Sequence, residues 1–433
     1  MKKIFYLDDS IVNKISYWHL VCFLVTLPFD FFYSEIVLIS FGVHTLIHLK
    51  RDHFKTILSK EVLVLTSIFL LGVVALLYSP DKPEGINIIT RQLAILIFPL
   101  AFALNGLDLD KYKLPLFQWF AFTCVGTILY LYIDALVTIR YFHLPLSTLF
   151  TLAFMNHNFS FPIELHATYL SIYVAFSIIV FSCLLASCRV GWMKFMYIAC
   201  IIVLSAGLLQ LSSRAVFIAL LMVIVIVFPF LLFKGRRRIW FIITSVLFSC
   251  LLLFAINNID SFKTRYLSEL KKDLTQKPTL IEVSEPRMAR WEVIMEMVKQ
   301  SPIVGYGTGS EKDMLQQKYF EKKLYTSYIH QFNTHSEYLS FLLKTGIIGL
   351  ALFIYVLYFG FARAWKTRDV YFLGFMTLSS IVCVSENVID LNKGIFFYSF
   401  FFSLFLLKDR LRDRINGDIS TAKQATDINL ISF

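Results

Sequence analysis

Runs of apolar residues, most of them long enough to span a membrane, recur along almost the whole chain. A helix needs about 20 mostly apolar residues to cross a bilayer. Twelve runs fit this description, the first two being short enough to form a single hairpin, with approximate limits 15–30, 33–49, 61–78, 89–106, 114–137, 163–186, 192–209, 213–233, 238–256, 337–363, 369–386 and 394–408. The pattern predicts an all-α, polytopic integral membrane protein with about twelve transmembrane helices.

One long polar stretch, residues 257–335, interrupts this series. Ser284-Glu285-Pro286 is typical of a helix start. The helix predicted after it ends before Ser301-Pro302, and its apolar face would consist of Trp291, Ile294, Met295 and Val298. A glycine-rich turn at 305–309 and a second amphipathic helix at 311–330 follow.

These features divide the chain into four parts. We expect an N-terminal transmembrane bundle, a large loop with amphipathic helices, a C-terminal group of about three spans and a polar, disordered tail, at residues 1–256, 257–335, 336–408 and 409–433. The first ten residues do not resemble a cleavable signal peptide, because polar Asp8-Asp9-Ser10 stands where an apolar core would be.

Composition supports a membrane protein and excludes other classes. The chain has 433 residues, of which 57% are hydrophobic and 16% charged, with 44 Phe. Its net charge of +11 does not indicate a nucleic-acid partner, since most Lys and Arg residues stand in short loops between apolar runs. The seven cysteines all lie in or beside apolar runs, without disulfide or metal-site spacing, and are expected to be small packing residues.

The distribution of Lys and Arg predicts the orientation of the spans. Of the 41 such residues, 23 fall at the termini and in alternate short loops, and six on the opposite side when the long loop is left out. Positive residues favour the cytoplasmic side, and long loops translocate largely regardless of charge. Both termini are therefore expected in the cytoplasm, with residues 257–335 outside, which in a Gram-negative cell is the periplasm.

His335 is the first candidate for chemistry, because it stands where the polar stretch re-enters an apolar run. By position alone it would be an ordinary interfacial histidine capping the next helix. His335-Ser336 is followed, after nine residues, by Gly346-x-x-Gly349. That pattern resembles the signature of the bacterial O-antigen ligase and polymerase family, membrane enzymes that also include protein O-oligosaccharyltransferases. The resemblance implies that His335 is catalytic, either accepting the proton of the acceptor hydroxyl or orienting that hydroxyl.

Three arginines are candidates for holding a diphosphate. Arg214 stands in an outward turn that is otherwise poor in charge, where an arginine suggests an anionic partner, although arginine at a helix end can also reach an interface. The family has a Ser-Arg at such a position, which matches Ser213-Arg214. Arg287-x-x-x-Trp291, followed by Pro302-x-x-Gly305-x-Gly307, is similar to another family stretch. The resemblance places the family's arginine on Arg287, at a helix N-terminus suited to anions, with Arg290 as an additional candidate.

Weaker candidates lie at other outward helix ends. His166 resembles a family histidine at a span mouth and, like Arg91 and Ser336, could contact donor or acceptor. Less weight falls on His157 and Glu386, and Lys344 is expected to extend outward to the interface. Asp108-Leu109-Asp110 is interpreted as a solvated turn rather than a metal-binding pair, because Lys111 and Lys113 lie beside it. No metal site and no cofactor are expected.

The resemblance implies a glycosyltransferase-C-like fold and an O-antigen ligase-like activity. Such an enzyme moves a glycan from undecaprenyl diphosphate to an acceptor hydroxyl, with inversion and without a metal, at the periplasmic face of the bacterial inner membrane. Lipid A–core is the favoured acceptor. A polysaccharide polymerase and then a protein O-oligosaccharyltransferase are the alternatives within the family. From other classes, a transporter or flippase would need ionisable groups near the bilayer midplane, and a passive structural protein would not explain the outward arginines.

Overall fold

The computed structural model describes residues 8–274 and 285–409, except for the side chains of residues 252, 255, 256 and 272. The predicted tail after residue 409 and Ser284 of the predicted helix start lie outside the described residues. Within the described ranges all regular structure is helical, with no strand. The predicted all-helical fold is therefore confirmed.

Each of the twelve apolar runs coincides with one helix or with a few consecutive helices. Those of the first half are α2 (Ile11–Thr26), α3 (Phe31–Ile47), α5 (Lys60–Leu76), α6 (Lys82–Arg91) with α7 (Leu93–Leu104), α8 (Leu109–Tyr141) and α10 (Ala167–Ser187). Those of the second half are α11 (Gly191–Leu211), α12 (Arg214–Met222) continued by the π-helical turn η5 (Val223–Val227) and α13 (Phe228–Leu232), α14 (Arg236–Asn258), α20 (Glu337–Thr367), α21 (Val370–Val382) and a helix at 392–409. Short helices fill the connections: η1 (Arg51–His53), α4 (Phe54–Ile57), η2 (Leu146–Phe150), η3 (Leu152–Phe154), α9 (His157–Ser160) and η4 (Phe161–Ile163).

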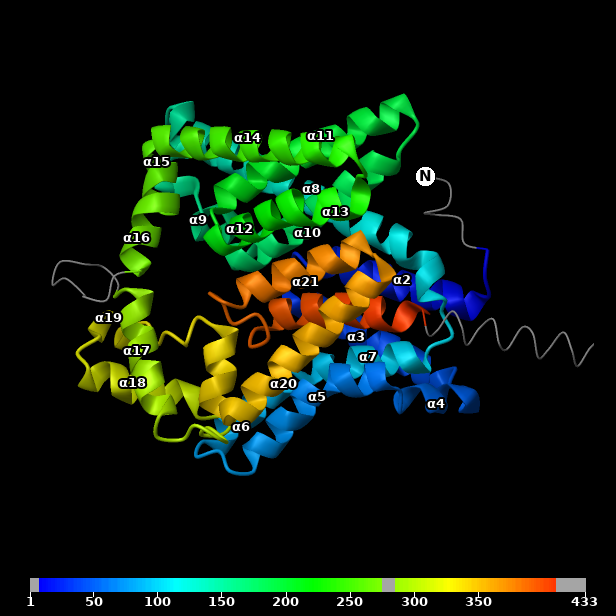
Figure 1. Ribbon diagram of the computed structural model, residues 1–433, viewed down its shortest axis with the longest axis vertical. Coiled ribbons are helices and arrows are strands. Elements are labelled where there is room, and N and C mark those ends of the chain that lie inside the picture. The colour runs from blue at the N-terminus through cyan, green and yellow to red at the C-terminus, as the bar shows by residue number, and fades with distance from the viewer. Residues whose placement is uncertain (1–7, 275–284, 410–433) are drawn as a thin grey trace, which may run out of the picture.

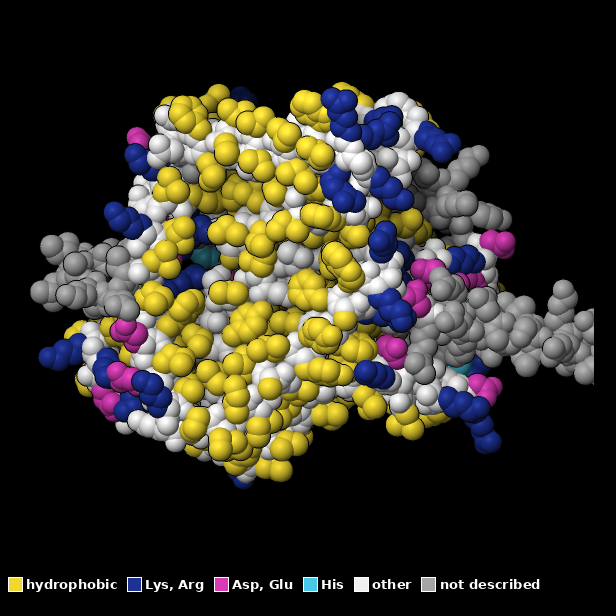
Figure 2. Space-filling view, in the orientation of Figure 1, with side chains coloured by type: hydrophobic (Ala, Val, Ile, Leu, Met, Phe, Trp, Pro, Cys, Tyr) yellow, Lys and Arg dark blue, Asp and Glu magenta, His cyan; other side chains and the backbone are white. Residues whose placement is uncertain are grey.

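The long helices form one bundle whose axes run roughly side by side (Figure 1). By length and composition, six of the described helices qualify as membrane spans, or seven if α3 and the segment after it, bent by 118°, are counted as one broken span. Figure 2 shows hydrophobic side chains over the middle of one face of the bundle, with Lys and Arg side chains toward its two ends. This distribution matches a bilayer-exposed surface, and the chain is a multi-pass membrane protein.

Aromatic side chains dominate the interior of the bundle. Phe117 of α8, Phe176 of α10 and Phe401 of the helix at 392–409 are fully buried. The rings of Phe176 and Phe401 lie 4.7 Å apart and meet edge to face. Four of the seven cysteines are buried as well, and all seven are free. The buried four fit the predicted packing role, whereas Cys22 and Cys250 are exposed.

The segment between α14 and α20 lies across one end of the bundle (Figure 1). It contains α15 (Asp260–Lys263), the π-helical turn η6 (Thr264–Ser268), α16 (Glu269–Asp273), α17 (Arg287–Val298), α18 (Glu311–Glu321) and α19 (Tyr325–Ile329). Two sequence predictions were wrong in detail here. Met295 is 41% exposed because α17 buries the face formed by Ala289, Val293, Ile294, Met297 and Val298. The single helix predicted at 311–330 is split into α18 and α19, and Lys323 adopts a positive φ of 61° at the break.

Gly346, the first glycine of the Gly346-x-x-Gly349 motif, has a structural explanation. Gly346 interrupts α20 with φ 62° and ψ −160°, a region that is essentially restricted to glycine. The backbone of residues 302–307 bonds to this break: Tyr306 N donates to Leu343 O at 3.0 Å, Gly307 N to Lys344 O at 2.8 Å and Ile347 N to Pro302 O at 2.9 Å. The glycine-rich turn therefore attaches the end segment to α20, the helix that begins just after His335.

We expect Gly346→Ala to destabilise the fold by at least about 2 kcal/mol, through backbone strain and steric overlap. A Cβ at residue 346 would lie 2.2 Å from Ile303 O, at a φ that side chains disfavour. The melting temperature of the purified protein measures this loss. Gly126→Ala in α8 is the matched control, since a Cβ there would meet nothing within 4 Å. Equal melting temperatures for the two variants would contradict the assigned role of Gly346.

Candidate functional site

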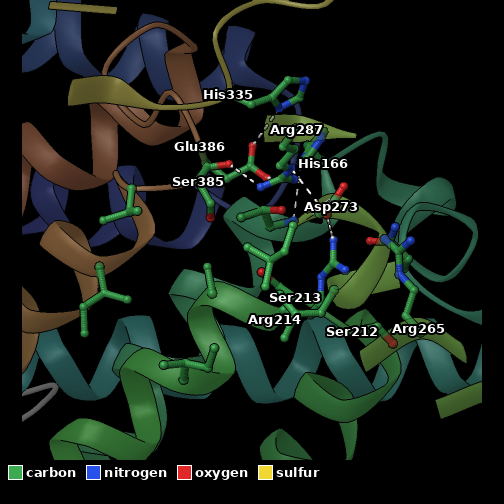
Figure 3. A pocket seen from close by; sticks show the side chains of 18 of the residues that line it. His166, Ser212, Ser213, Arg214, Arg265, Asp273, Arg287, His335, Ser385 and Glu386 are labelled. Carbon is green, nitrogen blue, oxygen red and sulfur yellow. Dashed lines mark hydrogen bonds and ion pairs between the residues drawn. The ribbon is translucent and has the colours of Figure 1, made fainter. Parts of the chain in front are cut away.

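A cavity of about 340 Å³ opens at the end of the bundle that carries α15–α19 (Figure 3). We call it the arginine cavity. Helices and connections distant in sequence contribute its walls: α9 and the start of α10, the α11–α12 turn, η6 and α16, the start of α17, the segment before α20, and the turn after α21. Its polar lining includes His157, His166, Ser212, Ser213, Arg214, Arg265, Asp273, Arg287, His335 and Glu386.

Four helices direct their N-termini to the arginine cavity. His166 is the N-cap of α10, Arg214 and Arg287 are the first residues of α12 and α17, and His335 precedes Ser336, the N-cap of α20. The first N–H groups of a helix lack partners within the helix and carry partial positive charge. The starts of α12 and α17 are therefore suited to an anion. At α10 and α20 the first N–H groups already have acceptors: Thr168 N donates to His166, and Glu337 N donates to Cys383 O.

Arg214 and Arg287 converge on one carboxylate. Arg214 Nη2 lies 2.6 Å from Asp273 Oδ2, and Arg287 Nε lies 3.7 Å from the same oxygen. Arg287 Nη1 also donates to Ser385 O at 2.9 Å. Nη1 of Arg214 is buried, with no hydrogen-bond partner in the described part of the chain. Asp273 thus occupies a position between two guanidinium groups, and one of these has a donor unused.

His335 is held beside Glu386 at the same cavity. Its Nδ1 lies 3.7 Å from Glu386 Oε2, and the other carboxylate oxygen lies 3.5 Å from Arg287 Nη2 (Figure 3). Burial alone would raise the pKa of Glu386, but the neighbouring His335 and the charges of Arg287 and His166 outweigh it and lower that pKa to about 2. The carboxyl is therefore ionised at every physiological pH and can orient the imidazole.

The backbone at His335 is unusual. Its φ is 45°, in the left-handed region that costs most side chains about 1–2 kcal/mol. Its N–H donates to Asn333 Oδ1 at 3.0 Å. Strained residues of this kind concentrate at functional sites, where surrounding contacts hold them in place.

Those contacts form a buried polar network behind the cavity. Glu311 accepts from Thr334 N at 2.9 Å and from Ser340 Oγ at 2.6 Å, and Thr334 Oγ1 donates to Asn387 Oδ1 at 3.2 Å. Lys344 was expected to reach outward, but it is 9% exposed and pairs with Glu311 at 3.0 Å and Asp390 at 2.9 Å. The expectation for Lys344 was wrong because its carboxylate partners come from distant segments. The network fixes the positions of His335 and Glu386 relative to each other.

His166 faces the cavity as a neutral side chain. Burial lowers its pKa to about 4, the charges of His157, His335 and Arg287 act in the same direction, and only Glu386 opposes them. Its Nδ1 accepts from Thr168 N at 3.3 Å, so the ring proton belongs on Nε2, which is then available as a donor. Its ring lies 4.1 Å from that of His157.

The depressed pKa of His166 predicts a pH dependence of stability. The unfolded chain, with an ordinary histidine pKa of 6.5, binds more protons than the folded chain between about pH 6.5 and 4. The free energy of unfolding therefore falls as the pH is lowered through this window. We expect His166→Gln to flatten this decline, measured as the melting temperature at about pH 7.5 and 4.5. Burial also lowers the pKa of His157, so part of the slope should remain. A full slope in the variant would contradict the assignment.

Three candidates from the sequence lie outside the cavity. Arg290 is 6% exposed and its guanidinium lies over the Phe332 ring, 4.9 Å from the ring centroid. Arg91 pairs with Glu84 at 3.0 Å. Ser336 is buried, and its hydroxyl caps α20 by accepting from Leu339 N. Arg290 and Ser336 therefore pack within the protein, and Arg91 pairs at the end of α6, which lies outside the lining of the cavity.

Sequence reasoning missed two charged residues of the cavity and undervalued a third. Asp273 and Arg265 follow α14 in a stretch without a motif, and Glu386 stands in the turn after α21. Arg265 pairs with Glu269 at 2.5 Å. The sequence feature that could have identified these residues is a charge beside the outward end of a span. It identified Arg214, but many surface residues share it.

Fold and cavity together define a polytopic helical membrane protein with a basic, histidine-containing site at one end of its bundle. Residues 198–354 match the family model described as O-antigen ligase. This match, over less than half of the chain, agrees with the resemblance that the motifs predicted, and members of that family are glycosyltransferase-like enzymes acting on lipid-linked glycans. The matched range includes Arg214, Arg287 and His335 and excludes His166 and Glu386. No curated protein matches the chain.

Proposed function

We propose that this protein transfers a glycan from undecaprenyl diphosphate to an acceptor hydroxyl, with lipid A–core as the favoured acceptor. One observation carries the proposal: Arg214, Arg287 and His335, distant in sequence, line a single cavity at the end of a membrane-spanning bundle. Two guanidinium groups fit a diphosphate, and an imidazole paired with a carboxylate fits proton transfer.

The donor would bind with its diphosphate between the two arginines. Asp273 holds the place of an anion there, at 2.6 Å from Arg214 and 3.7 Å from Arg287. An apolar path for the polyprenyl chain begins at the same point. Ile218 of α12 lines the cavity, and Met222 at the end of α12 and Ile226 in η5 follow it at intervals of four residues, all three exposed. Such a stripe would let the lipid tail extend along the bundle into the bilayer.

The chemistry follows from this placement. The acceptor oxygen attacks the anomeric carbon of the donor sugar, a new carbon–oxygen bond forms, and the bond from that carbon to the diphosphate oxygen breaks. The leaving diphosphate carries the electron pair away and is stabilised by Arg214 and Arg287. His335, oriented by Glu386, takes the acceptor proton or positions the hydroxyl that carries it. Attack opposite the leaving group inverts the anomeric centre.

The choice of lipid A–core as the acceptor rests on the sequence motifs. The matched family model is described as O-antigen ligase, and the spacing of His335-Ser336 to Gly346-x-x-Gly349 is kept less regularly in polymerases. A polymerase that extends another lipid-linked repeat is the first alternative, and a protein O-oligosaccharyltransferase the second. A transporter or flippase is disfavoured because the charged groups that line the cavity stand at helix ends and in short connecting segments at one end of the bundle.

The orientation is part of the same proposal. Twelve spans of a glycosyltransferase-C-like bundle would place both termini in the cytoplasm of a bacterium and the arginine cavity at the periplasmic face of its inner membrane. Lys234, Arg236, Arg237 and Arg238, in the loop before α14 and at its start, support this assignment as a strong cytoplasmic anchor. The four parts predicted from the sequence then become two groups of spans, the periplasmic segment 257–335 and a cytoplasmic tail.

A reconstituted assay tests the proposal. The purified protein in lipid nanodiscs is incubated with a glycan on undecaprenyl diphosphate and, separately, with lipid A–core, a second lipid-linked glycan or a Ser/Thr peptide. We expect release of undecaprenyl diphosphate together with a glycosylated acceptor, whose identity separates the three family activities. Movement of intact donor across a vesicle membrane, without release and with none of the acceptors modified, would overturn the proposal in favour of a flippase.

A further inference from the structure

A second cavity is lined in part by residues close in sequence to residues that line the first. Its volume is about 410 Å³, and we call it the aromatic cavity, after Phe29, Phe31 and Tyr130 in its wall. Asp30, Glu164 and Lys393 provide its charges. Glu164 and His166 belong to one turn, and Lys393 follows Glu386 along one connection. The two cavities therefore share the segments 164–166 and 386–393, although no residue lines both.

Lys393 indicates that the aromatic cavity is a binding site. The residue is 9% exposed, and its Nζ is buried with no hydrogen-bond partner in the described part of the chain. Removing an ammonium group from water without a partner is costly. A bound ligand with an acceptor oxygen would offset that cost. The neighbouring side chain of Asn392 is engaged elsewhere, since its amide donates to Glu35 Oε1 at 2.9 Å.

The charges of the cavity select a neutral ligand. One ammonium and two carboxylates line it, so a phosphate would face both Asp30 and Glu164, and a cation would face Lys393. A hydroxyl group can donate to a carboxylate and accept from an ammonium at the same time. Many hydroxyls on one small ring therefore satisfy this set of side chains better than a single charge of either sign does.

The aromatic side chains complete the match. Phe29, Phe31 and Tyr130 are 39%, 47% and 48% exposed, so their rings are available for contact. An apolar ring face next to a few converging polar groups is the usual composition of a small-ligand site, and a pyranose presents an apolar C–H face beside its hydroxyls. We infer that the aromatic cavity binds a neutral hexose unit of a glycan. Whether that glycan is an acceptor or a growing chain depends on the proposed function, whereas the sugar binding itself does not.

Direct binding tests the inference without any transfer reaction. Saturation-transfer NMR is recorded on the purified protein in nanodiscs with the methyl glycosides of glucose, galactose and N-acetylglucosamine. We expect at least one sugar to bind, and Tyr130→Ala to weaken its binding at least fivefold. Tyr33→Ala is the matched control, since Tyr33 is 56% exposed and close in sequence to Phe31 but does not line the cavity. Lys393→Met should weaken binding as well. If Lys393→Met does not fold, Tyr130→Ala still tests the inference, because Tyr130 is at an exposed position.

Three outcomes would overturn the inference. The first is that none of the three sugars binds. The second is that a sugar binds equally to wild type and Tyr130→Ala but is lost in Arg214→Ala, which would assign it to the arginine cavity and leave the proposed function intact. The third is that a phospholipid is retained by the wild type and lost from Lys393→Met, without sugar binding, which would make the cavity a lipid head-group site. Failure of the proposed function would instead appear as absence of undecaprenyl diphosphate release, with sugar binding unchanged.

Discussion

Arg214→Ala is expected to lower glycan transfer at least about 100-fold, because it removes a preorganised positive group from the place where the leaving diphosphate gains charge. The side chain is well placed for this role. Arg214 is the first residue of α12, and its Nη1 is buried without a partner in the described part of the chain. Release of undecaprenyl diphosphate per enzyme, at saturating acceptor, measures the effect. Arg287→Ala should behave in the same way, since both guanidinium groups reach the same Asp273 oxygen.

Conservative and control variants sharpen this prediction. Arg214→Lys should recover little, because an ammonium cannot present the planar pair of donors that a phosphate accepts. Arg140→Ala is the matched control, since Arg140 stands in the last turn of α8, is exposed and does not line the cavity. Asp273→Asn should act in the opposite direction and lower the KM for the donor, because the carboxylate competes for both arginines. Full activity in Arg214→Ala at normal melting temperature would contradict the assigned role.

The sequence was sufficient for the all-helical, multi-pass class of the fold because the decisive signal was local. Each apolar run of membrane length became helical, and Ser213-Arg214 and Pro286-Arg287 mark helix starts that the structure also has. Helix N-termini at one end of a bundle converge when alternate spans run in the same direction. Among the residues at those helix starts, the family resemblance indicated Arg214, Arg287 and His335 as the candidates.

The partners of those residues could not be predicted in the same way. Arg214 and Asp273 are 59 positions apart, and Arg287 and Glu386 are 99 apart. Such pairs depend on which loops meet, and neither periodicity nor local propensity determines this. Arg290 illustrates the converse error. It stands three residues from Arg287 and was grouped with it, but one turn of α17 carries it onto the buried face over Phe332.

Replacing His335 is expected to separate its two possible roles, as base and as orienting group. Alanine is a poor choice, because the φ of 45° at this position would add strain to the loss of the imidazole. Glycine and asparagine both tolerate that backbone. We expect His335→Gly to lower transfer by about 100-fold or more, the usual size of a general acid–base contribution. His335→Asn keeps a hydrogen-bonding group without a base, so activity close to that of the glycine variant indicates proton transfer. Activity clearly above it indicates orientation.

Glu386→Gln provides the pH test for the same pair. The pKa of Glu386 is about 2, so the carboxylate does not titrate in the working range and any acid limb of the pH–rate profile belongs to another group. The variant removes the charge that orients the imidazole. The maximal rate should therefore fall throughout the working pH range, because the ring loses its orienting partner at 3.7 Å. Glu84→Gln, which affects the pair with Arg91 outside the cavity, should leave the rate unchanged. A rate identical to wild type in Glu386→Gln would contradict the orienting role of this carboxylate.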